Sequence, residues 1–175
     1  NGVDLEMFGS LPRSRELAAK FGLPEESLIV GYGGNHGRSQ ALTQVLDAAK
    51  ILRGEKVHFA LFGDGPEKDS LMERARGEGL DNVSFHPSQP REKMNGVQAQ
   101  WDVALAPLKN IELFNGARPS KMFELMAGGI PFVFCGRGEG ADLAVASGCA
   151  VAVPPEEPEK LAEAIRGLAA LGSDG

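Results

Sequence analysis

Residues 28–40, LIVGYGGNHGRSQ, join a short apolar run to a loop that has glycines at positions 33, 34 and 37. An apolar run of this length that ends at glycines is typical of a buried strand. From Ser39 to Leu52, apolar residues recur every three or four positions, which predicts one face of a helix. The order of strand, glycine loop and helix belongs to a βαβ unit and indicates an α/β protein.

The same alternation of short apolar runs and helical patterns continues along the chain. Pro66, Pro90 and Pro158 are each expected as the first residue of a helix, because proline loses no hydrogen bond there. We therefore predict a single domain over residues 1–175, built on a doubly wound, Rossmann-like parallel sheet. Ligands of such sheets bind beyond the carboxyl ends of the strands. The six predicted strands are Leu28–Tyr32, Val57–Phe62, Val83–His86, Val103–Ala106, Pro131–Phe134 and Ala150–Val153.

The composition, with 42% hydrophobic and 24% charged residues over 175 positions, is that of a folded domain. The net charge of -6 argues against a nucleic-acid partner, which would require a concentrated basic surface. Cys135 and Cys149 lie in apolar runs without metal-type spacing, so we interpret both as reduced core residues of a cytoplasmic protein. No run is long enough to span a bilayer and no signal peptide is recognisable, while the missing initiator methionine indicates that an upstream part was removed.

The glycine loop is the first candidate binding site, because it leaves a strand and opens a helix. Glycines let backbone amides approach a ligand, and the amides and dipole of a helix start favour an anion. Arg38 adds a planar cation that suits phosphate oxygens. The spacing is not that of a dinucleotide fingerprint, which argues against NAD, and an ordinary strand-to-helix turn remains the alternative. The candidate residues of this loop are Gly34, Asn35, His36, Gly37, Arg38 and Gln40.

A second candidate site lies in residues 116–129, GARPSKMFELMAGG. Pro119 is expected to begin a helix that carries Ser120 and Lys121 in its first turn, where amides and a cation can meet an anion. Glu124 follows one turn later on nearly the same face, and its two oxygens suit the two adjacent hydroxyls of a ribose. The alternative is an exposed ion pair between Glu124 and Lys121. Gly116 and Ala117, which precede this helix, complete the candidate set.

The turn at residues 63–67, GDGPE, follows a predicted buried strand. We interpret Asp64 as the cap of a helix that Pro66 begins, which is a structural role. No nucleophile elbow, zinc motif or phosphate-binding Walker loop is present in the sequence. The sequence therefore assigns no catalytic residue, and it predicts neither a metal site nor a cofactor.

Taken together and in this order, the motifs resemble the C-terminal domain of glycosyltransferase family 4, across nearly the whole chain. The resemblance implies the C-terminal half of a GT-B fold, with the N-terminal domain missing. Residues 34–38 and 113–117 are similar to the subgroup that makes bacterial polysaccharides with N-acetylated amino sugars. The segments that carry the family resemblance are residues 1–4 (NGVD), 62–66 (FGDGP), 83–86 (VSFH), 104–108 (ALAPL) and 119–131 (PSKMFELMAGGIP).

The resemblance implies roles for several residues of this chain. Glu124 would hold the ribose hydroxyls, the loop around Arg38 would face the diphosphate, and backbone atoms near Ser88 and Gln89 would contact the base. The chain departs from the family at Asn35 and Gln40, where an Arg and a Lys are usual, so Arg38 and Lys121 are expected to supply the charge. It also has Gly116 where the first glutamate of the family's Glu-x7-Glu motif would lie, which leaves the donor sugar unassigned.

These expectations describe the donor-binding domain of a retaining, hexosyltransferase-type enzyme. It would transfer a sugar from a UDP-linked donor to a glycan or lipid-linked acceptor, which the missing N-terminal domain would bind. The inner membrane would be reached, if at all, through that domain, and the isolated chain is expected to be inactive. Two alternatives remain open at this point, a GT-B nucleotide-sugar epimerase and a binding module without catalysis.

Overall fold

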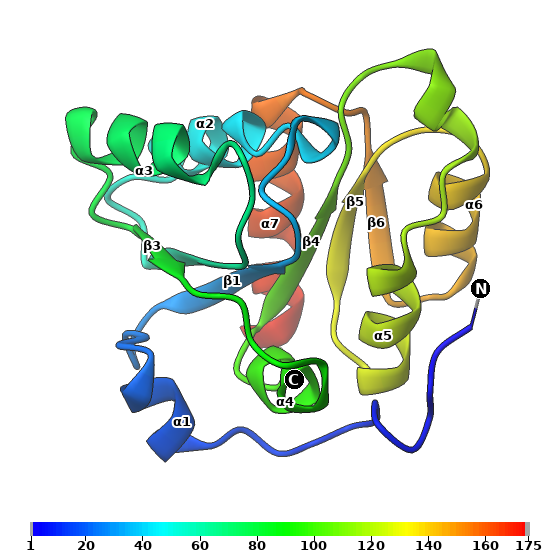
Figure 1. Ribbon diagram of the computed structural model, residues 1–175, viewed down its shortest axis with the longest axis horizontal. Coiled ribbons are helices and arrows are strands. Elements are labelled where there is room, and N and C mark those ends of the chain that lie inside the picture. Colours follow the sequence, from blue (N-terminus) through cyan, green and yellow to red (C-terminus); the bar gives the residue numbers. More distant parts are fainter. Residues whose placement is uncertain (1, 174–175) are drawn as a thin grey trace.

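The computed structural model describes residues 2–173 and contains a six-stranded sheet in which every neighbouring pair is parallel (Figure 1). The strand order is β3-β2-β1-β4-β5-β6. The chain builds the sheet outward from β1 to β3, then returns to place β4 beside β1 and continues in the other direction to β6. This is the doubly wound arrangement that the sequence predicts. The strands are β1 (Leu28–Gly33), β2 (Val57–Phe62), β3 (Val83–His86), β4 (Val103–Pro107), β5 (Phe132–Cys135) and β6 (Ala150–Val153).

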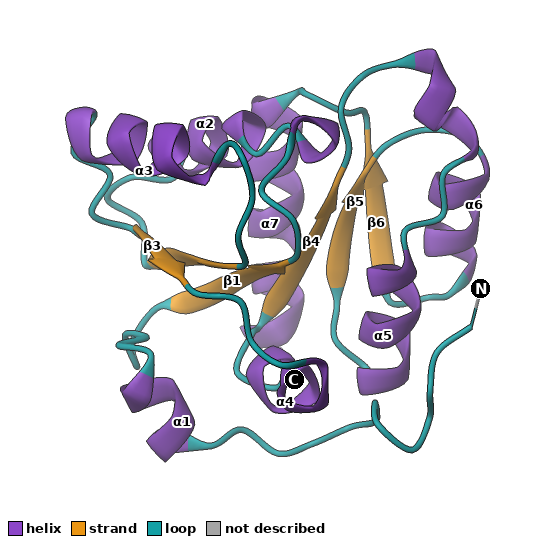
Figure 2. Cartoon of the chain, in the orientation of Figure 1, coloured by secondary structure: helices purple, strands orange, loops and turns teal. Residues whose placement is uncertain are grey.

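Helices cover both faces of the sheet (Figure 2). Helices α2, α3 and α7 pack on one face, and α1, α4, α5 and α6 pack on the other. The helices are α1 (Arg15–Lys20), α2 (Thr43–Ile51), α3 (Lys68–Gly77), α4 (Arg91–Gln98), α5 (Ser120–Gly128), α6 (Glu139–Ala146) and α7 (Pro158–Ser173), with two 3-10 turns, η1 (Arg38–Gln40) and η2 (Glu112–Gly116).

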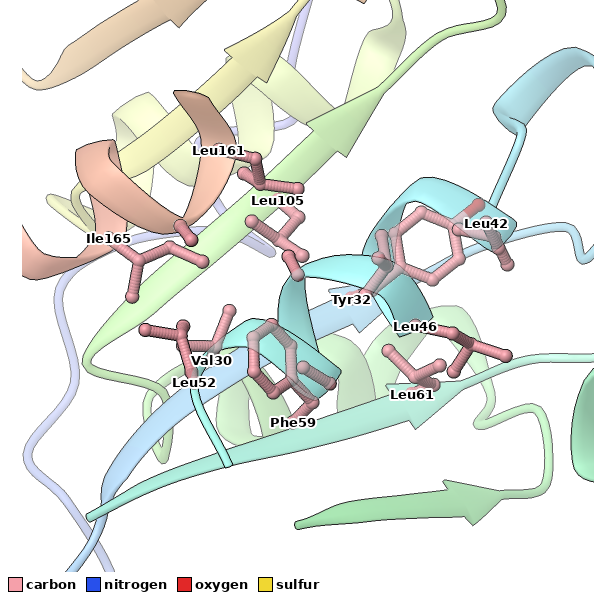
Figure 3. Packing of buried hydrophobic residues seen from close by; sticks show 14 of the residues in the cluster. Val30, Tyr32, Leu42, Leu46, Leu52, Phe59, Leu61, Leu105, Leu161 and Ile165 are labelled. Atoms are coloured by element: carbon pink, nitrogen blue, oxygen red, sulfur yellow. The ribbon is translucent and has the colours of Figure 1, made fainter. Parts of the chain in front are cut away.

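The two hydrophobic cores follow from the alternation of side chains along each strand. Val30 and Tyr32 of β1 lie on the same face as Leu61 of β2, and α2 and α7 cover them (Figure 3). Ile29 and Phe62 lie on the opposite face. Because both faces are covered, β4 and β5 at the centre of the sheet are apolar throughout rather than alternating. Each buried side chain of this size contributes about 1.5–3 kcal/mol, so the core holds the strand ends, and the loops beyond them, in place.

The predicted helix from Ser39 to Leu52 begins later than expected, at Thr43. Residues 38–40 form η1 instead, and Ala41 adopts a left-handed conformation with φ 45°, which interrupts the helical path. The side chain of Gln44 is bound in this position, because its amide donates to the carbonyl of Leu108 at 3.1 Å. The tertiary contact therefore overrides the local helical pattern.

Three proline predictions also need correction. Pro90 and Pro119 precede α4 and α5 as N-cap residues, with extended ψ angles of 144° and 135°, and Pro66 lies two residues before α3. The residue that caps a helix keeps an extended conformation, which a proline also adopts easily. Pro158 does begin α7, as predicted.

The N-terminal segment, residues 2–14, passes α5 and α4 before it reaches α1 (Figure 1). Phe8 is buried, and the amide of Gly9 donates to Oδ1 of Asn95 on α4 at 3.3 Å. Asn1, where the family resemblance begins, lies outside the described residues.

Both cysteines are free, as predicted, but only Cys135 belongs to the buried core, because Cys149 is half-buried. Among residues 2–173, no helix is both long enough and apolar enough to cross a membrane.

Candidate nucleotide-binding site

A cavity of about 400 Å³ opens at the carboxyl ends of β1, β2 and β3, between α4 and α5. This is the edge of the sheet at which doubly wound proteins bind their ligands. Five of the residues predicted from the sequence line it: Gly34, Asn35, Ser88, Gln89 and Glu124. The other lining residues are Phe8, Gly33, Phe62, Gly63, Asp64, Arg91 and Met94.

The loops after β1 and β2 are locked to each other by backbone hydrogen bonds. The amide of Gly34 donates to the carbonyl of Phe62 at 3.0 Å, and that of His36 donates to the carbonyl of Asp64 at 2.8 Å. Gly63 has φ 139°, and a Cβ there would lie 1.9 Å from the carbonyl oxygen of Gly34, so only glycine fits. Within residues 2–173 the amide of Asn35 has no acceptor, so this rigid loop presents a free donor.

Lys121 is half-buried, and its ammonium lies against the loop that follows β1. Its Nζ donates to the hydroxyl of Tyr32 at 3.2 Å and lies 4.3 Å from the centre of the Tyr32 ring. Burial lowers the pKa of Lys121 to about 8, although the charge of Glu124 acts in the opposite direction. No carboxylate in the described part of the chain forms a salt bridge with it. An ammonium has three donors, so Lys121 retains capacity for an anion.

Tyr32 connects Lys121 to the loop. Its hydroxyl donates to the carbonyl of Asn35 at 2.6 Å while it accepts from Lys121. A Cβ on Gly34 would lie 2.8 Å from Nζ of Lys121, which shows how closely the loop and the ammonium approach. The ammonium of Lys121, in the first turn of α5, thus lies beside the loop that follows β1, and a cation near a helix start favours an anion.

Glu124 lies one turn beyond Lys121 on α5 and lines the cavity with a side chain that is 13% exposed. Its partners come from α4 rather than from its own helix. Oε1 lies 3.2 Å from Nη1 of Arg91, and Oε2 lies 3.4 Å from Nε2 of Gln98. The exposed ion pair with Lys121, considered as an alternative, is therefore not formed in this structure.

The other loop candidates do not line the cavity. His36 is buried, its Nδ1 lies 3.2 Å from the carbonyl oxygen of Gly34, and burial lowers its pKa. The amide of Gly37 donates to Oε1 of Gln40 at 3.3 Å, so both residues stabilise the turn. The side chain of Arg38 is 86% exposed and lies 3.7 Å from Glu67. These residues support or surround the loop rather than form the cavity wall.

Gly116, Ala117 and Ser120 lie before and at the start of α5, also outside the cavity lining. The backbone here packs on the loop before α6, where a Cβ on Gly138 would lie 1.6 Å from the carbonyl oxygen of Asn115. A Cβ on Gly116 would meet nothing within 4 Å. Ser120 is exposed at the first position of α5.

Sequence reasoning misassigned one lining residue and missed several others. Asp64 is not a helix cap, because the N-cap of α3 is Glu67, and Oδ1 of Asp64 instead accepts from the amide of Gly65 at 2.8 Å. The sequence does not indicate that Phe8 lines the cavity, because its burial depends on contacts with residues that are distant in the chain. Arg91 had one usable signal, since it begins the helix after the loop that follows β3, and such folds place ligand-binding residues beyond the strand ends.

Residues 27–170 match the family model described as glycosyl transferases group 1. The chain belongs to this family. A curated relative, the putative colanic acid biosynthesis glycosyl transferase WcaI of Escherichia coli (strain K12), is 33% identical over 147 residues. That alignment covers 82% of this chain but 36% of the relative, so this chain spans little more than a third of the relative's length.

Solved structures agree on the fold. The Anabaena protein HepE, determined in complex with UDP and glucose, superposes with a TM-score of 0.78 at 22% identity, over 95% of this chain and 45% of HepE. The C-terminal domain of a group 1 glycosyl transferase (LpcC) from Francisella tularensis superposes with a TM-score of 0.76 at 15% identity, over 97% of this chain and 88% of that domain. The fold is thus that of the C-terminal domain of a GT-B glycosyltransferase, as the sequence predicts.

Proposed function

We propose that this chain is the donor-binding domain of a glycosyltransferase and that it binds a UDP-linked sugar. The observation that carries the proposal is the placement of Lys121 and Glu124 one turn apart on α5. Lys121 is a half-buried lysine whose ammonium has no carboxylate partner among the described residues, while Glu124 lines the adjacent cavity. A cation followed by a carboxylate matches the order of a diphosphate and a ribose along one nucleotide.

The diphosphate would lie beyond the end of β1. The free amide of Asn35 and the ammonium of Lys121 would donate to its oxygens, and the exposed Arg38 is free to turn towards it. Cleavage of the bond between sugar and phosphate leaves negative charge on the diphosphate. Donors that are already in place stabilise this charge without reorganisation, which is the main contribution we assign to this domain.

The nucleoside would occupy the cavity between α4 and α5. Glu124 would accept hydrogen bonds from the two ribose hydroxyls, and backbone atoms of Ser88 and Gln89 would contact the base. The preference for uracil is supported by the fold of HepE, whose structure was determined with UDP. The acceptor and the retaining course of the reaction belong to this proposal as well.

A second domain would complete the enzyme. This chain spans 36% of WcaI and 45% of HepE, which leaves room in both proteins for an acceptor-binding domain. Transfer requires the acceptor to be held close to the donor with water excluded. We therefore expect a protein that contains both domains to transfer sugar, and the 175-residue chain alone to bind the donor without turnover.

Thermal unfolding of the 175-residue chain in the presence of UDP, ADP, GDP and uridine tests the proposal. A ligand at 100 times its dissociation constant adds about 2.7 kcal/mol to the free energy of unfolding. We expect UDP to raise the melting temperature more than ADP or GDP, and uridine at the same concentration to have a much smaller effect because it lacks the diphosphate. Equal stabilisation by uridine and UDP, or no stabilisation by any nucleotide, would count against the site.

A further inference from the structure

The carboxylate of Glu124 is held from one side by two donors of the neighbouring helix. Arg91 and Gln98 are seven residues apart on α4, so two helical turns place them on the same face. Arg91 approaches Oε1 at 3.2 Å and Gln98 approaches Oε2 at 3.4 Å. Each oxygen of the carboxylate therefore has one protein partner, and the plane of the carboxylate is fixed by both.

This arrangement leaves an acceptor position on each oxygen. An ionised carboxylate has about four lone-pair positions, two on each oxygen. One position on Oε1 is used by Arg91 and one on Oε2 by Gln98, so one remains on each oxygen of Glu124. Two adjacent ribose hydroxyls need one acceptor each, which matches the one free acceptor position on each oxygen of Glu124.

Gln98 is oriented by its bond to Glu124 at the expense of its own oxygen. Its side chain is buried, and its Oε1 has no partner within residues 2–173. A buried acceptor without a partner costs about 1–3 kcal/mol. The flipped amide would point its oxygen at the carboxylate of Glu124, which is a repulsive contact. The structure thus accepts one unsatisfied oxygen in order to present Nε2 to Glu124.

Arg91 is held in place by the segment that precedes α1. Its guanidinium lies 5.4 Å from the centre of the Phe8 ring, a cation–π distance, and Phe8 itself is buried. The amide of Gly9, next to Phe8, donates to Asn95 on the same helix as Arg91. The Arg91 side chain is 59% exposed, so without the Phe8 ring its ion pair with Glu124 would be weak and mobile.

We propose that Arg91 and Gln98 are positioning residues that set the carboxylate of Glu124 for two ribose hydroxyls, and that Phe8 keeps Arg91 in this position. The proposal rests on the role of Glu124 as the ribose ligand under the proposed function. Arg91 has a second effect, because its charge offsets that of Glu124 beside a diphosphate. The donor site consequently includes the segment before α1 as well as the loops of the sheet.

The test is isothermal titration calorimetry of the 175-residue chain with UDP and with 2′-deoxy-UDP. Arg91→Met should weaken UDP about fivefold and lower the preference for UDP over 2′-deoxy-UDP, because the carboxylate loses its orientation. Arg91→Lys should recover part of this preference, and Phe8→Leu should give a smaller loss of the same kind. Lys93→Met is the matched control, since Lys93 is an exposed cation of the same helical turn, and it should change neither value.

A double-variant cycle separates positioning from direct contact. In a Glu124→Gln background, Arg91→Met should have little further effect on either ligand, because the carboxylate to be positioned is gone. Equal losses for UDP and 2′-deoxy-UDP, or an undiminished loss in the Glu124→Gln background, would overturn the proposal. Melting temperatures of all variants show whether a loss reflects unfolding.

The outcomes also distinguish this inference from the proposed function. If Glu124→Gln abolishes the ribose preference but Arg91→Met leaves it intact, the proposed function stands and the positioning role is wrong. If the wild-type chain does not bind UDP, both are overturned. If it binds UDP but Glu124→Gln keeps the full preference, donor binding stands, Glu124 is not the ribose ligand, and the positioning role is overturned.

Discussion

Replacing Lys121 by methionine removes a half-buried charge but keeps an unbranched side chain of similar length. Among the described residues the ammonium has one hydrogen-bond partner, Tyr32, and desolvation lowers its pKa from the ordinary value of 10.5 to about 8. One pKa unit corresponds to about 1.4 kcal/mol, so the difference amounts to about 3 kcal/mol of lost stability at neutral pH. We therefore expect Lys121→Met to raise the free energy of unfolding at pH 7 by up to that amount.

The stability difference between the wild type and Lys121→Met should depend on pH. Below pH 8, Lys121 is protonated in both the folded and the unfolded chain, and the full cost is present. Between pH 8 and pH 10.5 the unfolded chain binds more protons than the folded chain, so the stability of the wild type rises. The advantage of the methionine variant should accordingly shrink over this range and vanish above it.

Urea unfolding at about pH 7 and about pH 10 measures both effects. Lys109→Met serves as the control, because Lys109 is exposed and should show neither the gain nor its pH dependence. Calorimetry should show that Lys121→Met weakens UDP about tenfold and leaves uridine nearly unchanged. A less stable variant, a gain that does not depend on pH, or equal losses for UDP and uridine would refute the role assigned to this ammonium.

Three further predictions concern the glycine loop after β1 and the groups beside it. Gly63→Ala should lower the free energy of unfolding by about 3 kcal/mol in urea, because the φ of 139° at Gly63 and the carbonyl of Gly34 exclude a Cβ. The control Gly116→Ala should change it by no more than about 0.5 kcal/mol. Similar losses for both variants would show that the loops after β1 and β2 are not locked together. Arg38→Ala should lower the affinity for UDP about threefold in calorimetry and leave that for uridine unchanged. The effect should be smaller than that of Lys121→Met because the Arg38 side chain is 86% exposed. An unchanged UDP affinity would remove Arg38 from the site. At about pH 8.5, UDP binding should take up a proton on Lys121, visible as a binding enthalpy that depends on the ionisation enthalpy of the buffer, and the Lys121→Met variant should lose this dependence.

The strands could be predicted from the sequence because local patterns determine them. Each of the six predicted runs becomes a strand, with ends that agree to within one residue, since apolar residues between turn signals leave few alternatives. The start of α2 could not be predicted, because the left-handed conformation of Ala41 goes with a contact between Gln44 and Leu108, which are 64 residues apart. Sequence patterns report on neighbours in the chain and not on such distant contacts.

In the candidate site, too, local motifs could be predicted from the sequence and tertiary contacts could not. Glu124 and the glycine loop could be found because they belong to motifs within single segments. The partners of Glu124 could not, because Arg91 and Gln98 lie 33 and 26 residues away and meet it only when α4 and α5 pack together. The partial burial of Lys121 and the contact of Phe8 with Arg91 also depend on tertiary packing, so the sequence indicated the proposed ligands of the nucleotide better than the residues that support them.

The most direct test of the nucleotide site compares UDP with 2′-deoxy-UDP on the wild-type chain and on Glu124→Ala. A hydrogen bond to a charged group contributes about 1.5–3 kcal/mol, so the variant should bind UDP about tenfold to a hundredfold more weakly. The wild type should prefer UDP over 2′-deoxy-UDP, and the variant should bind the two nearly alike while its melting temperature stays close to that of the wild type. If Glu124→Ala keeps the wild-type preference for UDP, Glu124 is not the ribose ligand and the placement of the nucleotide is wrong.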